Sequence, residues 1–448
     1  MPQSLTNDYL TYAPHPPTST LTQWLEESNG ITRQILLNTS AADQLVPQLN
    51  ILNPPLWEFG HLTWFHEFWV HRDGKENMQS LLRDADYLFN SSEMAHEDRW
   101  STPMPSLESL LEYNKRVIEN TQQLLSKPID DKTAYFVQLA IFHQDMHNEA
   151  FAYMWQTMGR SIPFTPLSSP STALDNNQTW IHFPQTSLHA GSERGSGFIF
   201  DNEKWAHSIN LPAFDIASKP VTNSDYLEFL ESRGNLAHSN SVAPPSHWKK
   251  DGDFWLERFF NQWLPLNPTS AVRHISYLDA QLFCEHNQVR LPSEHELSLL
   301  MSQKHMAWQP SNLWEWTSST FAPFPGFTAD PYTDYSKPWF DGNYQVLKGW
   351  SMFTPERLRR SAFRNFYGRN IRANYIGNIS LKAAGPAMVF IGLHRVIGIF
   401  HHQLRSVIYC RQGNRTHHYS GALGCRYSLR DRDSVKRIKS RRWRSASD

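Results

Sequence analysis

Two histidines separated by three residues stand in the run "IFHQDMHNEA", residues 141–150. In an α-helix, His143 and His147 point in the same direction from adjacent turns, which can present two ring nitrogens to one metal ion. A lone histidine on an apolar face is more often an ordinary core residue, so the pair is the informative feature. His61, in "EFGHLTWF", supplies a third candidate from an earlier helix. The pattern predicts a three-histidine metal site.

The types of ligand restrict which metal ions the site could bind. Three neutral imidazoles with no thiolate partner suit Fe(II), Zn(II) or Mn(II) with open positions for substrate. Asp145 and Glu149 flank the pair but lie off its stripe, so they either accept the ring N–H groups or are solvated. His66 and His71 fall on other faces of the early helix, and we expect them to be exposed.

Four helical segments must position these histidines. Residues 19–40, 55–72 and 106–125 have helical periodicity, and a fourth helix is expected from about Lys132 to Met158. Asp130 or Asp131 supplies its cap and Gly159 its stop. Four helices of this length predict an antiparallel bundle over residues 17–160.

The chain changes character after the bundle. Residues 161–178 form a linker rich in Ser, Pro, Thr and Asn, and residues 179–376 contain short strand-like runs with many turns. This texture predicts an irregular α+β domain. A length of 448 residues also favours two domains. The expected fold class is therefore α plus α+β.

The net charge of -1 conceals a basic tail at residues 377–448. This tail holds 14 of the 42 Lys and Arg but 3 of the 43 Asp and Glu, which leaves the preceding chain at -12. One interpretation is a nucleic-acid-binding arm. The interpretation we favour is an aberrant or disordered terminus, so we expect no nucleic-acid partner.

Cysteine usage and hydropathy indicate the compartment. The three cysteines are widely spaced without a CxxC pair, which fits a reducing environment. The first residues lack the basic and apolar regions of a signal peptide. The longest apolar run, residues 384–400, is broken by His394 and Arg395 and is too short to span a bilayer. We expect a cytoplasmic protein with no membrane partner.

Two resemblances follow from these residues. The first 160 residues resemble a DinB-type helical bundle, in which one early histidine joins an H-x-x-x-H pair. The second domain resembles the formylglycine-generating-enzyme or sulfatase-modifying-factor fold, related to C-type lectins, on "NLWEWTSSTFAPFPGF" (312–327) and "RLPSE" (290–294). The two domains in this order resemble the ergothioneine-pathway sulfoxide synthases and their ovothiol and selenoneine relatives.

The resemblance implies a specific reaction. In that family three histidines, matched here by His61, His143 and His147, hold a non-haem Fe(II). The implied substrates are small molecules: hercynine, O2, and a thiol such as cysteine or γ-glutamylcysteine, or a selenium donor. A C–S or C–Se bond forms between hercynine and the donor.

Other site residues are implied in the same way. Tyr332, in "DPYTDYS" (330–336), matches a tyrosine that donates a proton or hydrogen, and Tyr335 matches a contact to the imidazole. Arg99 aligns loosely with arginines that bind the donor's carboxylates. The competing interpretation is aromatic packing for the tyrosines and an isolated surface position for the arginine.

Three departures from the family pattern bear on the substrate. Met146 stands where the ergothioneine enzymes have a glutamine, and Tyr367 follows Phe366 where they have Trp-Asp. These substrate-contacting positions look more like the selenoneine synthase branch, and aromatic faces can still hold a trimethylammonium group. The closing Gly-Phe-Arg or Gly-Leu-Arg motif is missing, which a frameshift near residue 377 explains.

Other functions use parts of the same pattern. A DinB-type thiol S-transferase would share the histidines, with zinc, but would not need Tyr332. A non-enzymatic lectin-like binding protein would leave the buried histidines without a partner. Formylglycine generation requires a late cysteine pair, whereas Cys284 alone lies within the fold.

Overall fold

The computed structural model describes residues 9–10, 14–168, 174, 178–234, 243–372, 376–378 and 382–383. Within these residues a helical N-terminal region is followed by a region of short strands and helices. The predicted α plus α+β fold class is confirmed. The predicted character of the basic tail beyond residue 383 lies outside the described residues.

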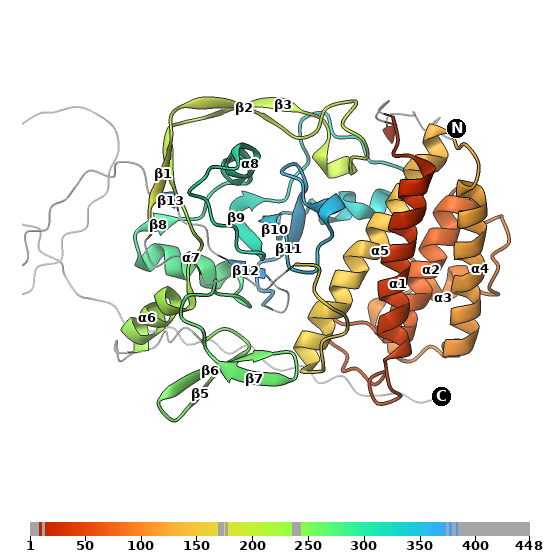
Figure 1. The fold of residues 1–448 in the computed structure, drawn as a ribbon, viewed down its shortest axis with the longest axis horizontal. Helices are drawn as coiled ribbons and strands as arrows, with labels where there is room; N and C mark the ends of the chain where they lie inside the picture. Colours follow the sequence, from red (N-terminus) through yellow and green to blue (C-terminus); the bar gives the residue numbers. More distant parts are fainter. Residues whose placement is uncertain are drawn as a thin grey trace, which may run out of the picture. The chain divides into compact units, whose positions relative to one another are not determined.

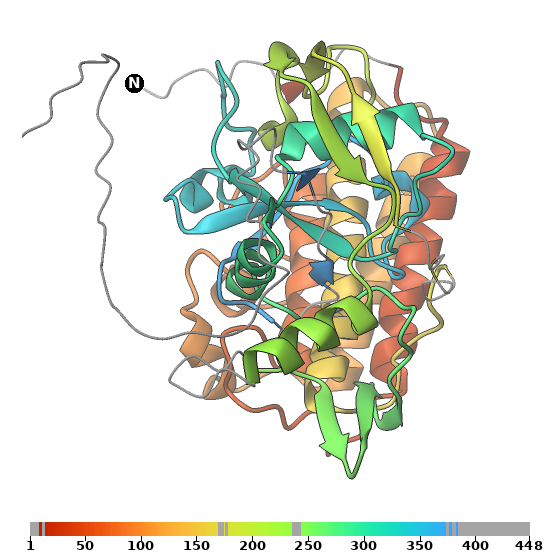
Figure 2. The same ribbon diagram turned by 90° about the vertical axis from the view of Figure 1, so that its left-hand side faces the viewer.

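The N-terminal region is built from four long helices that lie side by side (Figures 1 and 2). Helix α2 continues directly into a π-helical segment, Glu67–His71. A short helix α3 (Ala85–Phe89) and a 3-10 segment (His96–Trp100) follow before the third long helix. The long helices are α1 (Thr18–Leu37), α2 (Pro55–His66), α4 (Leu107–Leu125) and α5 (Asp131–Met158).

Local signals explain where α5 begins and ends. The Asp130 carboxylate accepts a hydrogen bond from the Thr133 backbone N–H at 2.8 Å, as an N-cap does. Gly159 ends the helix with φ +67°, a left-handed conformation that glycine adopts without strain. Both were predicted from the sequence, and this long, well-defined helix fixes the position of His143 and His147.

Helix α2 is enclosed on almost all sides. Every residue from Trp57 to His66 is buried, because α3, α4 and α5 pack around the helix. The prediction that His66 is exposed is therefore wrong. Its Nε2 lies 3.0 Å from the Thr121 hydroxyl of α4, and His71, half-buried, contacts the same hydroxyl at 2.8 Å.

The second region contains four small sheets. One has the order β1-β4-β13-β8 and another the order β11-β10-β9-β12, while β2-β3 and β5-β6-β7 form smaller antiparallel sheets. The described part of the same region contains three helices: α6 (Asn223–Gly234), α7 (Tyr277–His286) and α8 (Glu294–Gln303). The strands are β1 (Trp180–Phe183), β2 (Thr186–Ala190), β3 (His207–Leu211), β4 (Phe214–Ala217), β5 (Trp248–Asp251), β6 (Phe254–Phe259), β7 (Gln262–Pro265), β8 (Val289–Arg290), β9 (Trp314–Thr320), β10 (Tyr344–Gly349), β11 (Asn365–Gly368), β12 (Ile376–Asn378) and β13 (Lys382–Ala383).

Strand pairing extends past the predicted start of the tail at residue 377. Strand β12 pairs in parallel with β9, and β13 pairs antiparallel with both β4 and β8. The boundary at residue 376 therefore stays a prediction, as do the other predicted domain limits. No helix in the described part of the chain is both long and apolar enough to cross a bilayer.

Buried polar contacts tie α5 to the second region. The Asp145 carboxylate forms two hydrogen bonds of 2.7 Å with the Arg357 guanidinium. One turn further, the Glu149 carboxylate accepts from Trp314 Nε1 and from the Thr354 hydroxyl, each at 2.7 Å. These contacts set the second region against the helix that carries two of the three histidines.

Candidate metal centre

The three predicted histidines converge in space. One ring nitrogen from each of His61, His143 and His147 lies within 4.8 Å of those of the other two. The Nε2 atoms of His143 and His147 are 3.1 Å apart. Two ligands at right angles, each about 2.1 Å from a metal, are about 3.0 Å apart, so this spacing fits a shared ion.

Hydrogen bonds made by the Nδ1 atom orient two of the three histidines. His61 Nδ1–H donates to the Phe89 carbonyl oxygen at 2.8 Å, and His147 Nδ1–H donates to the Glu58 carboxylate. Each Nδ1–H bond leaves the Nε2 lone pair free for a metal. Asn53 Nδ2 also donates to Glu58, at 2.7 Å, and fixes the carboxylate.

His143 is held by stacking. Its ring lies face to face with Phe65, with centroids 3.6 Å apart and planes 8° from parallel. Its buried Nδ1 has no hydrogen-bond partner among the described residues. The Nε2 atom is the one that faces the cluster, 3.1 Å from His147 Nε2, so it is the ring nitrogen available to a metal.

Gly60 explains how the Phe89 carbonyl comes close enough to His61. A Cβ added at Gly60 would lie 2.1 Å from the Phe89 ring, which is too close for any side chain. The glycine therefore lets α3 pack directly on α2. This close approach places the Phe89 backbone beside the His61 ring.

The electrostatics favour neutral imidazoles. Burial, followed by the neighbouring His147, lowers the pKa of His61 to about 3. Burial also holds the pKa of His143 well below its ordinary value. Burial alone would raise the pKa of Glu58, but His147 and His61 outweigh this and the pKa is lowered. Metal binding requires neutral imidazoles, and His61 and His143 meet this requirement.

Glu58 is the site residue that sequence reasoning missed. We expected Asp145 or Glu149 to accept the ring N–H groups or to be solvated, and neither expectation is met, since both bind the second region. The available signal was the spacing Glu58-x-x-His61, which places a carboxylate one turn before a candidate ligand on an apolar helix.

A cavity of about 350 Å³ opens beside His143 and His147. Tyr332, Tyr335, Met146 and Tyr367, all predicted site residues, line it. The remaining lining residues come from both regions: Glu149, Tyr153, Trp314, Asp334, Trp339, Thr354, Leu358, Phe363, Asn365 and Phe366. The cavity is therefore formed jointly by α5 and the second region.

The two tyrosines approach the histidines from the second region. The Tyr332 ring lies 6.1 Å from the His143 ring and 4.9 Å from Phe65, centroid to centroid. The Tyr335 hydroxyl donates to Met146 Sδ at 3.8 Å. Burial raises the pKa of both phenols above the ordinary value. Both tyrosines thus keep their protons inside the cavity.

Buried carboxyl groups hold both ends of the tyrosine segment. At its start, Asp330 accepts from Lys204 Nζ at 2.6 and 2.7 Å and from the Tyr135 hydroxyl of α5 at 3.0 Å. At its end, the Ser336 hydroxyl donates to Asp201 at 2.5 Å. The start of this segment is thereby fixed against α5, and its end is fixed against Asp201 of the second region.

Arg99 lies outside the cavity lining. Its guanidinium stacks over the Trp57 ring at 3.8 Å and donates to Asn53 Oδ1 at 2.8 Å. Trp57 in turn stacks on His61, with centroids 5.0 Å apart. Arg99 is thus neither isolated nor in the cavity, and its predicted contact with a donor carboxylate remains a prediction.

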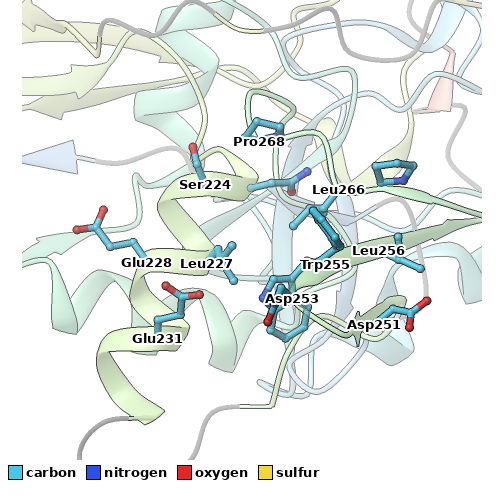
Figure 3. A pocket seen from close by; sticks show the side chains of 13 residues that line it. Ser224, Leu227, Glu228, Glu231, Asp251, Asp253, Trp255, Leu256, Leu266 and Pro268 are labelled. Carbon is cyan, nitrogen blue, oxygen red and sulfur yellow. The ribbon is translucent and has the colours of Figure 1, made fainter.

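A larger cavity of about 700 Å³ lies between α6 and the β5-β6-β7 sheet (Figure 3). It shares no lining residue with the histidine cavity. Leu227 and Glu231 of α6 point toward Trp255 and Asp253 across it (Figure 3). Its lining is apolar and acidic, and it holds no histidine, so the chemistry that the sequence predicted is in the smaller cavity.

Comparison with known proteins finds one family model that matches part of the chain. Residues 168–302 match the family model of the sulfatase-modifying factor enzyme 1-like domain. The predicted resemblance to formylglycine-generating enzymes is thereby confirmed for residues 168–302, and the limits 179–376 stay a prediction. PvdO of Pseudomonas aeruginosa, a solved structure, is 14% identical and covers 49% of this chain and 99% of its own, but the TM-score of 0.30 supports no further conclusion.

Relatives that cover most of the chain are then found among ergothioneine-pathway proteins. Hercynine oxygenase of Mycolicibacterium smegmatis is 24% identical over 70% of this chain and 88% of its own. The Mycobacterium tuberculosis protein of that name is 24% identical over 72% and 90%. Ergothioneine biosynthesis protein 1 of Schizosaccharomyces pombe is 22% identical over 78% of this chain and 53% of its own. The resemblance to the sulfoxide synthase family is confirmed.

Proposed function

We propose that this chain is an O2-dependent, non-haem Fe(II) enzyme that joins hercynine to a thiol or selenium donor. The observation that carries the proposal is the convergence of His61, His143 and His147 beside Tyr332, which comes from a different region of the chain. The similarity to hercynine oxygenases supports hercynine as the substrate.

His61, His143 and His147 would hold the metal through their Nε2 atoms. When bound, Fe(II) supplies open positions for substrates, acidifies a bound thiol and reacts with O2. For a thiol donor the reaction is balanced: hercynine, the thiol and O2 give the C–S coupled sulfoxide and one water. The thiol is cysteine or γ-glutamylcysteine, and a selenium donor would take the same place in selenoneine synthesis.

Tyr332 supplies a proton at its phenolic oxygen. Its raised pKa keeps it protonated until a stronger base forms in the cavity. The hydrogen bonds of Asp330 with Lys204 and of Ser336 with Asp201 hold the segment that places Tyr332 near His143. Folding has already ordered this proton donor, so the reaction loses no entropy in positioning it.

The other cavity residues orient the substrates and exclude water. Met146 and Tyr335 border the space next to His143 and His147, so they contact the imidazole ring of hercynine. Tyr367 of β11 also lines the cavity. Arg99 keeps its proposed role in binding the donor's carboxylate. A cytoplasmic location belongs to the proposal, since thiol donors stay reduced there.

Two other functions predict different behaviour. A zinc-dependent thiol S-transferase would need the histidines but would have no use for Tyr332 and Tyr335, which line the same cavity. A non-enzymatic binding protein would not need a cluster of three histidines in which Glu58 orients His147 and the Phe89 carbonyl orients His61. Both the tyrosines and the oriented rings favour the oxygenase.

The test is anaerobic loading of residues 1–448 with Fe(II), followed by addition of O2, hercynine and one donor. Cysteine, γ-glutamylcysteine and a selenosugar are offered in separate reactions, and products are identified by mass spectrometry. The proposal predicts a coupled product with one of them. Iron bound at one per chain with no coupled product from any donor would contradict it.

A further inference from the structure

The cavity between α6 and the β5-β6-β7 sheet has the size of a small-molecule site, at about 700 Å³. On the helix side, the lining residues Ser224, Leu227, Glu228 and Glu231 are spaced i, i+3, i+4 and i+7, so they form one stripe of α6. On the other side, the lining includes the turn between β5 and β6 and the end of β7. Two separate elements of the fold therefore form its walls.

Apolar side chains face each other across this cavity. Leu227 of α6 points toward Trp255 of β6 (Figure 3). Both residues, together with Leu266, are partly buried and pack against the main hydrophobic core, which fixes their positions. Fixed apolar side chains on facing walls favour a ligand with an apolar body, since binding removes apolar surface from water.

The acidic residues of the same lining have no cationic partner among the described residues. Glu231 points across the cavity toward Asp253 (Figure 3), and Glu228 and Asp251 add two more carboxylates. None of the four forms an ion pair with a side chain that the structure describes, and no described lining residue is a lysine, arginine or histidine. Carboxylates on facing walls produce a negative potential between them, which attracts a cation.

A buried amide in the lining gives independent evidence for a ligand. Asn223, the first residue of α6, has no exposed surface and donates from Nδ2 to the Asn267 carbonyl oxygen at 2.8 Å. Its Oδ1 has no hydrogen-bond partner in the described part of the chain. A buried acceptor without a donor is costly, so a nitrogen donor that reaches it from the cavity would be stabilising.

The order of these groups along α6 indicates the shape of the ligand. Asn223, Leu227 and Glu231 occupy successive turns, at i, i+4 and i+8. An unpaired acceptor, an apolar side chain and a carboxylate therefore follow one another over about 12 Å of the helix axis. A matching ligand carries a nitrogen donor at one end, methylene groups in the middle and an ammonium group at the other end.

We propose that the cavity between α6 and the β5-β6-β7 sheet binds a linear aliphatic polyamine. One terminal ammonium group lies between Glu231 and Asp253, and the other terminal nitrogen donates to Asn223 Oδ1. The methylene chain between them packs on Leu227 and Trp255. Chain length is the selected property, because a short diamine cannot reach both ends. The proposal is independent of the proposed reaction, because the two cavities share no lining residue.

Isothermal titration calorimetry with the full chain tests length and charge separately. Spermidine and 1,8-diaminooctane have two terminal nitrogens at the required separation. Octylamine has the same apolar chain but lacks the second nitrogen, and 1,3-diaminopropane has both charges but is too short. We expect each long amine to bind at least about tenfold more tightly than either of these two, because each control loses one charge-assisted hydrogen bond.

Variants test the position of the site. Glu231→Gln and Asp253→Asn each remove one charge from an exposed side chain, so both proteins should fold. Each should weaken the binding of 1,8-diaminooctane about threefold to tenfold. Glu285→Gln is the matched control, since it makes the same change at an exposed position of α7 outside the lining, and it should keep wild-type affinity.

Three results would overturn the proposal. Equal affinity for 1,8-diaminooctane and 1,3-diaminopropane would show non-specific attraction to an acidic surface. Unchanged binding in both Glu231→Gln and Asp253→Asn would place the ligand elsewhere. Absence of binding by both long amines at millimolar concentration would exclude the site. None of these results bears on the iron-loading and turnover experiment, which concerns the histidine cavity.

Discussion

The Glu58 carboxylate accepts a hydrogen bond from the Nδ1–H of His147, which lies 89 residues further along the chain. This contact joins α2 to α5 at the point where the three imidazoles meet. It fixes the His147 tautomer, because Nδ1 carries the proton and Nε2 faces His143.

Glu58→Gln tests this contact. The amide cannot stabilise a polarised imidazole as a carboxylate does, so we expect metal affinity to fall about 10- to 100-fold. The measurement is competition with a chelator of known affinity. Glu108→Gln, a change in the first turn of α4, should leave affinity unchanged. Wild-type affinity in Glu58→Gln would show that the hydrogen bond does not support a ligand.

Tyr332→Phe separates metal binding from the reaction. The ring lies 6.1 Å from His143 and is not a member of the histidine cluster, so iron should bind at wild-type stoichiometry. Loss of the phenolic proton should change the product or slow the coupling with O2 by about 10²–10⁴-fold. Oxygen consumption and product mass spectra are the measurements. Tyr344→Phe, on β10 and outside the cavity lining, is the control. Unchanged products and rate in Tyr332→Phe would exclude the tyrosine from the chemistry.

Asp201 makes stability depend on pH. Burial raises its pKa to about 7, although the Ser336 hydroxyl opposes the shift, while Asp330 adds to it and Lys204 reduces it. The folded state therefore keeps a proton that the unfolded chain releases near pH 4. The stabilisation is full below about pH 4 and is lost as the pH rises through about 7.

Urea unfolding at pH 5 and pH 8 measures this effect. From Asp201 alone, wild-type protein should be less stable at pH 8 by about 2–4 kcal/mol. Asp201→Asn should lower this difference, because an amide does not titrate. An equal pH dependence in both proteins would contradict the assignment to Asp201.

Features that depend on residues close in the chain could be predicted from the sequence. The limits of α5 follow from Asp130 and Gly159, two neighbours of the helix ends. The histidine pair follows from spacing on that helix. His61 could be proposed as a third ligand because it lies on an apolar helix.

Features that depend on distant partners were missed. The burial of His66 follows from α4 packing against α2 and bringing Thr121 to the ring. Asp145 and Glu149 turn toward Arg357, Trp314 and Thr354, which are more than 160 residues away. Helical periodicity shows which face a side chain occupies, but not which segment covers that face.

The central claim is that His61, His143 and His147 hold one metal ion. The most direct measurement is iron content per chain by elemental analysis after anaerobic loading and desalting. Wild-type protein should contain about one iron, and His61→Ala, His143→Ala and His147→Ala should each contain almost none. His66→Ala removes a buried histidine of the same helix that lies outside the cluster, so it should retain the iron. Full iron content in His143→Ala and His147→Ala would contradict the account.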